Sequence, residues 1–379
     1  MMRRAMKVAI PAESHAGEKR VAIVPESVKR LAAKKISLAI ESGAGSRSNY
    51  GDDEYRGLGA AVEASAGALL ADADVVIRLR VPTLDEVSAL KEGTALVAPI
   101  YPLVRLDLVR ALAERKVTTI SVDSIPRTTV AQMMDVLSSQ ATCAGYYAVI
   151  AAATRLPRFF PMLITAAGTI APAKVLVLGA GVAGLQAIGT ARRLGAVVEG
   201  YDVRKVVKEQ IESLGAKFVE VDTGEDAQTA GGYAKEVSEE AKKKQAEVLA
   251  KHIAKSDVVV TTALIPGKRA PVLVTEAMVK AMKPGSVIVD LAAEQQGNCE
   301  LTEAGKVTVK HGVTIMGELD LPSNVAMHAS QMYSRNMEKL LIHMSHDGAL
   351  KIDLTEEITK GSVITHGGEV VHAKVKELL

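Results

Sequence analysis

A glycine-rich turn between a strand-like run and a helical run constrains the fold of this chain more than any other feature. The apolar residues 174–178 are followed by Gly179-Ala-Gly181-Val-Ala-Gly184 and then by a helical pattern. In a strand, turn and helix of this kind, Gly179 allows the tight turn, Gly181 lets the backbone approach a pyrophosphate, and Gly184 lets the helix pack closely on the sheet. Amide groups at the helix start then face the phosphates. The segment therefore predicts a dinucleotide-binding unit.

The end of the next predicted strand indicates which dinucleotide this unit binds. Asp202 lies 18 positions after Gly184, where a carboxylate accepts hydrogen bonds from adenosine ribose hydroxyls and repels a 2′-phosphate. This predicts NAD(H) rather than NADP(H). Arg204 is an argument for a 2′-phosphate, but an arginine that opens the next helix is more often solvated. The residues predicted to contact the nucleotide here are Gly179, Gly181, Val182, Ala183, Gly184, Tyr201, Asp202, Val203 and Arg204.

Two later segments are predicted to belong to the same site. Ala263 and Leu264 follow a buried strand-like run, and ligands of an open parallel sheet lie beyond the carboxyl ends of its strands. Residues 223–234 are polar and glycine-rich and contain Gly232 and Tyr233. That composition is typical of a mobile flap carrying one aromatic ring, with a plain surface loop as the alternative.

The rest of the chain alternates between the two kinds of regular structure. Strand-like residues 7–11, 36–41 and 74–79 are separated by helical residues 26–35 and 66–72. Such alternation predicts a mostly parallel sheet covered by helices. We therefore expect an α/β protein with two Rossmann-like, doubly wound parallel-sheet domains separated by a cleft.

The two predicted domains are interleaved along the chain. Residues 1–137 form the first domain, which residues 325–379 complete, and residues 138–324 form the NAD(H)-binding domain. The reason is the helical pattern of residues 324–343, which is long enough to return the chain to the first domain.

Composition excludes several classes of function. A net charge of +2 over 379 residues gives no case for nucleic-acid binding. The two cysteines, Cys143 and Cys299, lie far apart, so neither a disulfide framework nor a metal site is predicted, and a reducing compartment fits best. No uninterrupted apolar stretch reaches the roughly 18 residues of a membrane span.

The segment after Pro126 combines polar residues with the start of a helix. Gln132, Asp135 and Ser138 are spaced by three, so they can project from one side of the forming helix. Arg127 precedes Asp135 by eight positions. These two residues suit either a structural ion pair or a binding role, and the spacing alone leaves both open.

Over nearly its whole length the chain resembles the NAD(H)-binding subunit, domain I, of proton-translocating nicotinamide nucleotide transhydrogenase. The resemblance implies a homodimer that docks on the NADP(H)-binding domain of the transhydrogenase beta subunit. It also implies direct hydride transfer between the two nicotinamides, coupled to proton movement, and a peripheral place on the cytoplasmic face of the membrane through the membrane subunits. The segments that carry the resemblance are Val8-Ala-Ile-Pro-Ala-Glu, Arg20-Val-Ala-Ile-Val-Pro, Pro126 to Gln140, Thr165-Ala-Ala-Gly-Thr, Thr229-Ala-Gly-Gly-Tyr233-Ala-Lys-Glu, Leu264-Ile-Pro-Gly-Lys and Met282-Lys-Pro-Gly-Ser-Val-Ile-Val-Asp-Leu.

The same resemblance assigns roles to the polar segment. Arg127, Gln132, Asp135 and Ser138 stand where the family places the residues around the nicotinamide and its carboxamide, and Gln132 would face the incoming NADP(H). Tyr233 stands at the flap position that closes over the bound nucleotide. The resemblance thus favours a reaction site over a structural ion pair.

Alanine dehydrogenase, which shares this architecture, is the main alternative. Its acid–base chemistry uses a strand-end histidine and an aspartate, and the corresponding positions here are Tyr101 and Glu294. Arg20 matches a substrate-binding arginine of that enzyme, while the paired lysine falls in Arg78-Leu-Arg80. The acid–base set is therefore incomplete, whereas hydride transfer between two nicotinamides needs none. A non-catalytic NAD-sensing module is the third possibility.

Overall fold

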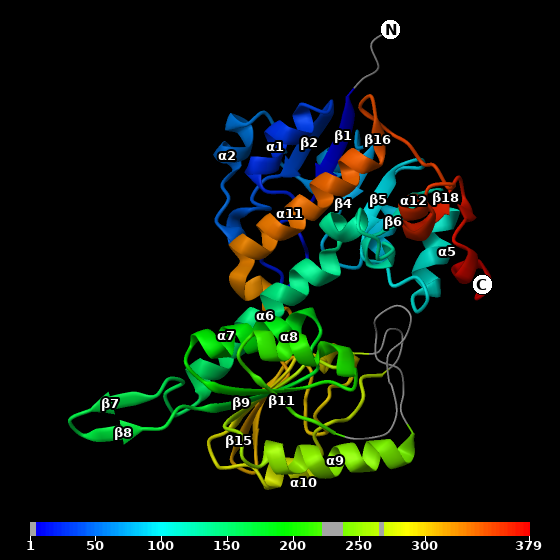
Figure 1. Ribbon diagram of the computed structural model, residues 1–379. Helices are drawn as coiled ribbons and strands as arrows, with labels where there is room; N and C mark the ends of the chain where they lie inside the picture. Colours follow the sequence, from blue (N-terminus) through cyan, green and yellow to red (C-terminus); the bar gives the residue numbers. More distant parts are fainter. Residues whose placement is uncertain (1–4, 222–237, 265–268) are drawn as a thin grey trace. The chain divides into compact units, whose positions relative to one another are not determined.

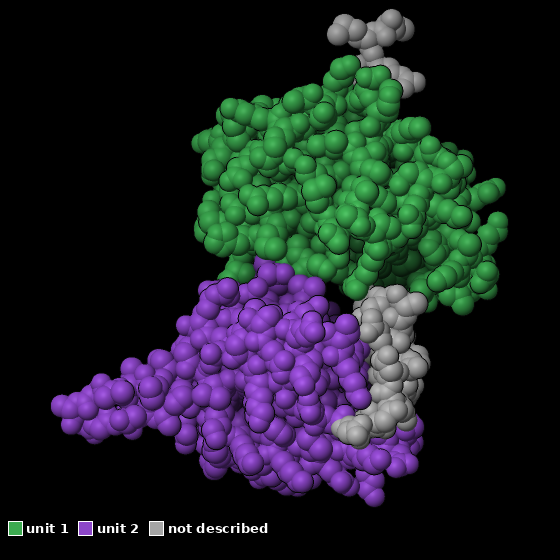
Figure 2. Space-filling view, viewed as in Figure 1, with its two compact units in different colours: residues 1–140, 323–379 green, residues 141–322 purple. Residues whose placement is uncertain are grey.

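The computed structural model describes residues 5–221, 238–264 and 269–379, and the chain divides into two compact units (Figure 1). Unit 1 comprises Met1–Gln140 with Ser323–Leu379, and unit 2 comprises Ala141–Pro322 (Figure 2). In each unit helices cover a mostly parallel sheet. The predicted α/β fold class with parallel-stranded sheets is therefore confirmed.

The described residues of unit 1 contain an eight-stranded sheet of order β19-β18-β6-β5-β4-β1-β2-β3. β1 pairs in parallel with β2 on one side and with β4 on the other, so the order of winding reverses between β1 and β4. Open sheets bind ligands at such a switch point. β18 is antiparallel to β6, so the end of the chain completes this sheet. The strands are β1 Met6–Ile10, β2 Ile36–Glu41, β3 Ala61–Glu63, β4 Val75–Ile77, β5 Ala95–Ala98, β6 Thr118–Ser121, β18 Val363–His366 and β19 Glu369–Val370.

Both faces of the unit 1 sheet are buried. Val8 and Ile10 lie in one core with Met337, whereas Ala9 between them lies in a second core with Leu108. Successive side chains of a strand point to opposite faces, so β1 reads as a continuous apolar run. The helices are α1 Pro25–Ala32, α2 Asp52–Gly57, α3 Ala66–Leu70, α4 Leu84–Ser88, α5 Leu106–Glu114, α11 Ala326–His343, α12 Glu357–Ser362 and α13 Ala373–Lys376, and β16 Ser345–His346 pairs with β17 Ala349–Leu350.

The described residues of unit 2 contain a seven-stranded sheet of order β11-β10-β9-β12-β13-β15-β14, in which only β14 is antiparallel. β10 and β12 flank β9, so the switch point of this sheet lies between β9 and β12. Val177 of β9 lies in a core with Ile188, and Leu176 lies in the core of the other face with Leu249. The elements are β9 Lys174–Leu178, β10 Val197–Tyr201, β11 Lys217–Phe218, β12 Val258–Thr261, β13 Val287–Asp290, β14 Val307–Lys310, β15 Val313–Met316, α7 Val182–Arg193, α8 Lys208–Ser213, α9 Glu239–Ile253 and α10 Glu276–Lys280.

A two-stranded hairpin projects from unit 2 without joining its main sheet. β7 Leu163–Thr165 pairs only with β8 Gly168–Ile170 among the described residues, and the hairpin extends as an arm (Figure 1). Ile164 is 75 % exposed on this arm. The sequence did not predict the hairpin, because three-residue strands lack the length that makes alternation recognisable.

Helix α6, Val136–Arg155, continues from unit 1 into unit 2, since the boundary lies after Gln140. No helix among the described residues, α6 included, has the length and apolar character needed to cross a membrane.

Candidate functional site

The glycine turn of unit 2 has the geometry of a tight strand-to-helix connection. Gly179 has φ +101°, and a Cβ there would lie 2.6 Å from Thr262 Oγ1. A Cβ on Gly184 would lie 1.8 Å from the Gly179 carbonyl oxygen, a distance no side chain tolerates. Thr262 donates a hydrogen bond to the same carbonyl at 3.0 Å. Only glycine therefore fits at both positions.

The start of α7 faces open space. Gly181 is the N-cap residue and makes no side-chain cap, and a Cβ built on it would meet nothing within 4 Å. The first amide groups of α7, from Val182, Ala183 and Gly184, point out of the helix end, as at any helix start. The loop thus combines close packing below with free room above, which is what a bound pyrophosphate requires.

Gly145 is a contributor to this geometry that the sequence analysis did not identify. It lies inside α6, and a Cβ there would lie 2.1 Å from the carbonyl oxygen of Ala183. α6 therefore crosses the first turn of α7 at backbone contact. A lone glycine inside a helical pattern is the sequence signal that indicates such a close crossing.

Asp202 is buried and fully engaged in hydrogen bonds. Its Oδ1 accepts from the Arg204 backbone N–H at 2.9 Å and from Arg204 Nε at 2.8 Å, while its Oδ2 accepts from Ala180 N–H at 2.8 Å and Arg204 Nη2 at 2.7 Å. The expectation that Arg204 is solvated was wrong, because its side chain is only 16 % exposed. Hydrogen bonding to Asp202 raises the pKa of Arg204 above its ordinary value. Tyr201 is buried beside this pair, and Val203 is half-buried.

The loop after β12 is fixed by an asparagine that the sequence did not single out. Asn298 is completely buried, its Oδ1 accepts from Ala263 N–H at 3.0 Å, and its Nδ2 donates to the carbonyl oxygens of Ala263 and Pro271, both at 2.8 Å. Leu264, the next residue, is 43 % exposed. The predicted flap with Gly232 and Tyr233 lies outside the described residues.

The polar segment predicted for the reaction lies in unit 1. Gln132 belongs to a 3-10 turn, Ala131–Met134, and Asp135 follows it as the residue before α6. The Asp135 carboxylate accepts from Ser138 N–H at 2.9 Å and from Ser138 Oγ at 2.6 Å, so it caps α6 and does not project from it as expected. Arg127 and Gln132 are exposed. Within unit 1 the structure brings Asp135 and Ser138 together.

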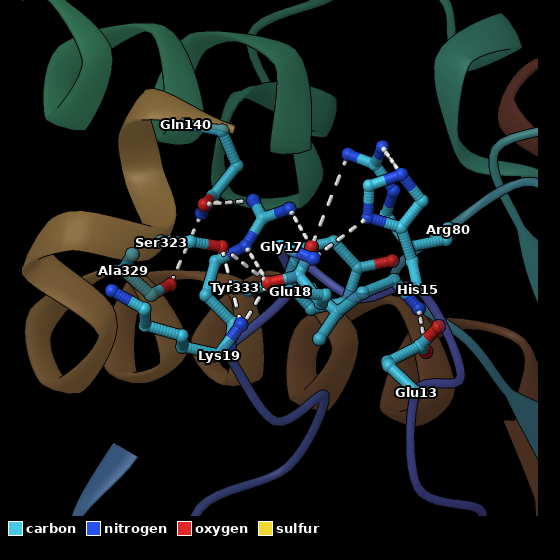
Figure 3. A network of polar contacts seen from close by, with 12 residues as sticks. Glu13, His15, Gly17, Glu18, Lys19, Arg80, Gln140, Ser323, Ala329 and Tyr333 are labelled. Atoms are coloured by element: carbon cyan, nitrogen blue, oxygen red, sulfur yellow. Dashed lines mark hydrogen bonds and ion pairs between the residues drawn. The ribbon is translucent and has the colours of Figure 1, made fainter. Parts of the chain in front are cut away.

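A buried polar cluster lies beyond β1, at the switch point of unit 1 (Figure 3). Arg20 donates through Nε to Glu18 Oε1 at 2.7 Å and through Nη1 to Gln140 Oε1 at 2.7 Å, and Ser323 Oγ donates to Glu18 at 2.7 Å. Burial favours the neutral form of Glu18, but Arg20 and Ser323 outweigh it and lower its pKa to about 2. The arginine that matches a substrate-binding residue of alanine dehydrogenase is thus paired within the chain.

Glu13 in the same cluster has the opposite protonation preference. Burial raises the pKa of Glu13 to about 7, although the Leu79 N–H donates to it at 2.7 Å and Arg78 lies nearby. Arg78 itself pairs with Glu86 at 3.0 Å. The cluster therefore holds nearly as many acidic as basic groups.

Profiles of one family describe both halves of the chain. The N-terminal domain of alanine dehydrogenase/PNT matches residues 9–144, and the C-terminal domain of alanine dehydrogenase/PNT matches residues 148–373. The chain belongs to this family.

Individual relatives show which branch of the alanine dehydrogenase/PNT family the chain resembles. It is 50 % identical over 376 residues to the first of the separate chains that form the NAD(P) transhydrogenase alpha subunit of Rhodospirillum rubrum, covering 97 % of this chain and 98 % of that protein. A solved transhydrogenase structure from Sinorhizobium meliloti is 46 % identical, with a TM-score of 0.88 over 96 % of this chain and 100 % of that one. An alanine dehydrogenase of Halomonas elongata is 27 % identical over 379 residues, covering 98 % of this chain and 96 % of that protein. The resemblance to transhydrogenase subunit alpha is therefore confirmed.

Proposed function

We propose that this chain is the NAD(H)-binding component of a proton-translocating NAD(P) transhydrogenase. The observation that carries the proposal is the glycine turn of unit 2, with Gly179 at positive φ, Gly184 at backbone contact and open space in front of Gly181. The 50 % identity to a transhydrogenase alpha subunit supports the reaction class. Family membership alone leaves both dehydrogenase and transhydrogenase chemistry open.

The residues of unit 2 fit NAD(H). The α7 amide groups would hold the pyrophosphate, Asp202 would accept from the adenosine ribose, and Ala263 and Leu264 would line the site at the end of β12. A Cβ at position 181 would project into the room that a pyrophosphate needs, so the glycine there suits the nucleotide. When bound, NADH supplies a hydride from C4 of its nicotinamide.

The residues of unit 1 would position the reacting ring. Arg127 and Asp135 would hold the dihydronicotinamide, Ser138 would fix the Asp135 carboxylate through the two hydrogen bonds described, and Gln132 would face NADP⁺ on the partner domain. Hydride transfer between two nicotinamides exchanges no proton at carbon, so these residues have to orient the ring and exclude water. A tyrosine in place of histidine at position 101 suits this chemistry.

The proposed partners follow the same assignment. A second copy of this chain would form the homodimer, and the NADP(H)-binding domain of the beta subunit would receive the hydride. Membrane subunits would carry proton translocation and hold this chain at the cytoplasmic face. The exposed apolar residues of the β7–β8 arm support the homodimer, since an isolated two-stranded hairpin is marginally stable unless it packs against something.

The test is a reconstitution of hydride transfer. The purified chain is mixed with a separately purified NADP(H)-binding domain of a transhydrogenase beta subunit, and reduction of an NAD⁺ analogue by NADPH is followed by absorbance. We expect turnover that needs both proteins. NADH binding without any transfer would leave a non-catalytic sensing module, and the proposal would fail.

Alanine dehydrogenase remains the second candidate because buried Arg20 matches its substrate-binding arginine. Its pairing with Glu18 and Gln140 argues against a free carboxylate-binding group. The purified chain should therefore not reduce NAD⁺ with L-alanine. Turnover in that assay would favour the dehydrogenase.

A further inference from the structure

The hydrogen bonds around Asp202 leave it no spare capacity. A carboxylate offers about four lone-pair positions, and the four donors from Ala180 and Arg204 occupy them. Three of these donors belong to Arg204. Ribose hydroxyls can therefore reach Asp202 only when side-chain bonds from Arg204 open.

Arg204 is equally committed to Asp202. Its Nε and Nη2 form a two-point pair with the two carboxylate oxygens, and the pair is largely buried, with the side chains 16 % and 6 % exposed. Charge-assisted pairs of this two-point geometry are among the stronger hydrogen-bonded contacts of proteins. The same guanidinium fork also matches a phosphate group.

We propose that Arg204 is a specificity-determining residue, a latent 2′-phosphate contact that Asp202 keeps occupied. This inference rests on the proposed NAD(H) site. Asp202 then discriminates against NADP(H) in two ways, since it repels a 2′-phosphate and also retains a nearby guanidinium that would bind it. Loss of the carboxylate removes the repulsion and releases Arg204 at the same time.

The experiment separates these two effects with the adenosine half of the nucleotide alone. Dissociation constants of ADP and of 2′,5′-ADP are measured by calorimetry for the full chain, for Asp202→Asn, for Arg204→Ala and for the double variant. The ratio of the 2′,5′-ADP constant to the ADP constant isolates the 2′-phosphate. We expect Asp202→Asn to lower this ratio about tenfold, the size of one hydrogen bond to a charged group.

The double variant decides the proposal. If Arg204 makes the phosphate contact, the double variant should lose most of the gain, and salt should weaken the binding of 2′,5′-ADP to Asp202→Asn. If Asp202 acts by repulsion alone, the double variant keeps the low ratio of Asp202→Asn, and the proposal is overturned. Arg193→Ala in the Asp202→Asn background is the matched control, because Arg193 lies at the other end of α7.

Two further arms keep the result interpretable. Asp202→Ser replaces Asp202→Asn should the latter unfold, as judged by thermal melting. ADP binding to the unaltered chain tests the nucleotide site itself, so its absence would count against the proposed function, whereas ADP binding with an Arg204-independent ratio would count against this inference alone.

Discussion

At the scale of single residues, two glutamates of unit 1 illustrate how burial and pairing compete. Both lie in the polar cluster at the switch point, where burial disfavours their charge. Glu18 has Arg20 and Ser323 as donors to its carboxylate and stays ionised. Glu13 receives one backbone N–H and its pKa is raised to about 7. Hydrogen-bond supply therefore decides which carboxylate carries charge.

Glu13 should make the stability of unit 1 depend on pH. Its pKa rises from 4.5 in the unfolded chain to about 7 in the folded protein, so the folded state binds more protons between these values and loses stability as pH rises through that window. We expect Glu13→Gln to gain up to about 3 kcal/mol relative to the unaltered chain between about pH 5 and about pH 8. Urea unfolding at both pH values measures this difference.

The neighbouring glutamate supplies the opposite control. The lowered pKa of Glu18 means that its contribution is present above 4.5 and is lost as pH falls toward about 2. Glu18→Gln should therefore destabilise unit 1 at neutral pH and show no gain between about pH 5 and about pH 8. A pH-independent effect of Glu13→Gln would contradict the assignment.

Gly184 is a residue whose missing side chain is required. Gly184→Ala would place a methyl group 1.8 Å from the Gly179 carbonyl oxygen, so the turn must shift. We expect a loss of stability of about 2 kcal/mol and a clear rise in the NADH dissociation constant. Gly189→Ala in the same helix is the control, because its Cβ would meet only the end of Arg193 at 3.4 Å and Leu214 at 3.8 Å. Equal effects of the two changes would show that the turn is not responsible.

At the scale of elements, the site depends on how neighbouring segments are tied together. α6 crosses α7 at Gly145, and Asn298 links the loop after β13 to the end of β12. Asp290, at the end of β13, accepts from four groups, including Thr261 of β12 at 2.9 Å and Thr302 at 2.6 Å. Buried polar side chains thus replace the regular ladder where the parallel strands end.

Asn298→Ala should disturb the nucleotide site through the loop after β12. It removes three hydrogen bonds and leaves buried carbonyl and amide groups of Ala263 without their partner, which costs about 1–3 kcal/mol for each unsatisfied group. We expect a lower melting temperature and a higher NADH dissociation constant. Asn324→Ala, at an exposed asparagine of unit 1, should change neither. Unchanged NADH affinity of Asn298→Ala would show that the loop does not contribute to binding.

The β7–β8 arm should hold the proposed dimer together. Ile164 and Ile170 are 75 % and 45 % exposed on it, and burial of such side chains against a second copy would be worth about 1.5–3 kcal/mol each. Ile164→Asp should shift the chain toward the monomer in sedimentation experiments without lowering its melting temperature. Val309→Asp, at a similarly exposed valine of unit 2, is the control. A dimer that survives Ile164→Asp would remove the arm from the interface.

At the scale of the whole molecule, the proposed work is divided between two units with separate sheets. Unit 2 carries the glycine turn, and unit 1 carries the polar segment with Asp135 and Ser138. Each unit buries both faces of its sheet, so each has its own core. Binding and reaction should therefore respond to different substitutions.

Substitutions in unit 1 should affect transfer more than binding. Arg127→Ala and Asp135→Asn are expected to slow hydride transfer to the partner domain at least tenfold, about 1.4 kcal/mol, while NADH affinity changes little. The reason is that both residues would orient the reacting ring, whereas the glycine turn binds the pyrophosphate. Stopped-flow transfer rates and NADH titrations provide the two measurements. Parent-like transfer rates in both variants would refute the assigned roles.

Much of the architecture could be predicted from the chain alone. The strands and helices around the glycine motif and the α/β class depend on local periodicity, which the sequence shows directly. The predicted strand at residues 216–221 was too long, because β11 is an edge strand with one partner and pairs over only Lys217–Phe218. Short helices such as α2 and α10 and the β7–β8 arm offered too few residues for a pattern.

The sequence by itself determined the glycine turn, the acidic residue at the end of β10 and the family resemblance, because each depends on residues close together in the chain. Only the tertiary structure decided that Arg204 is held by Asp202, that Asn298 clamps Ala263 and that Arg20 is spent on Glu18 and Gln140. The Asn298 and Gln140 contacts join residues 35 and 120 positions apart, and even the short-range pair with Arg204 depends on burial. Partner choice in a buried polar group follows from packing in space, which no local pattern of residues records.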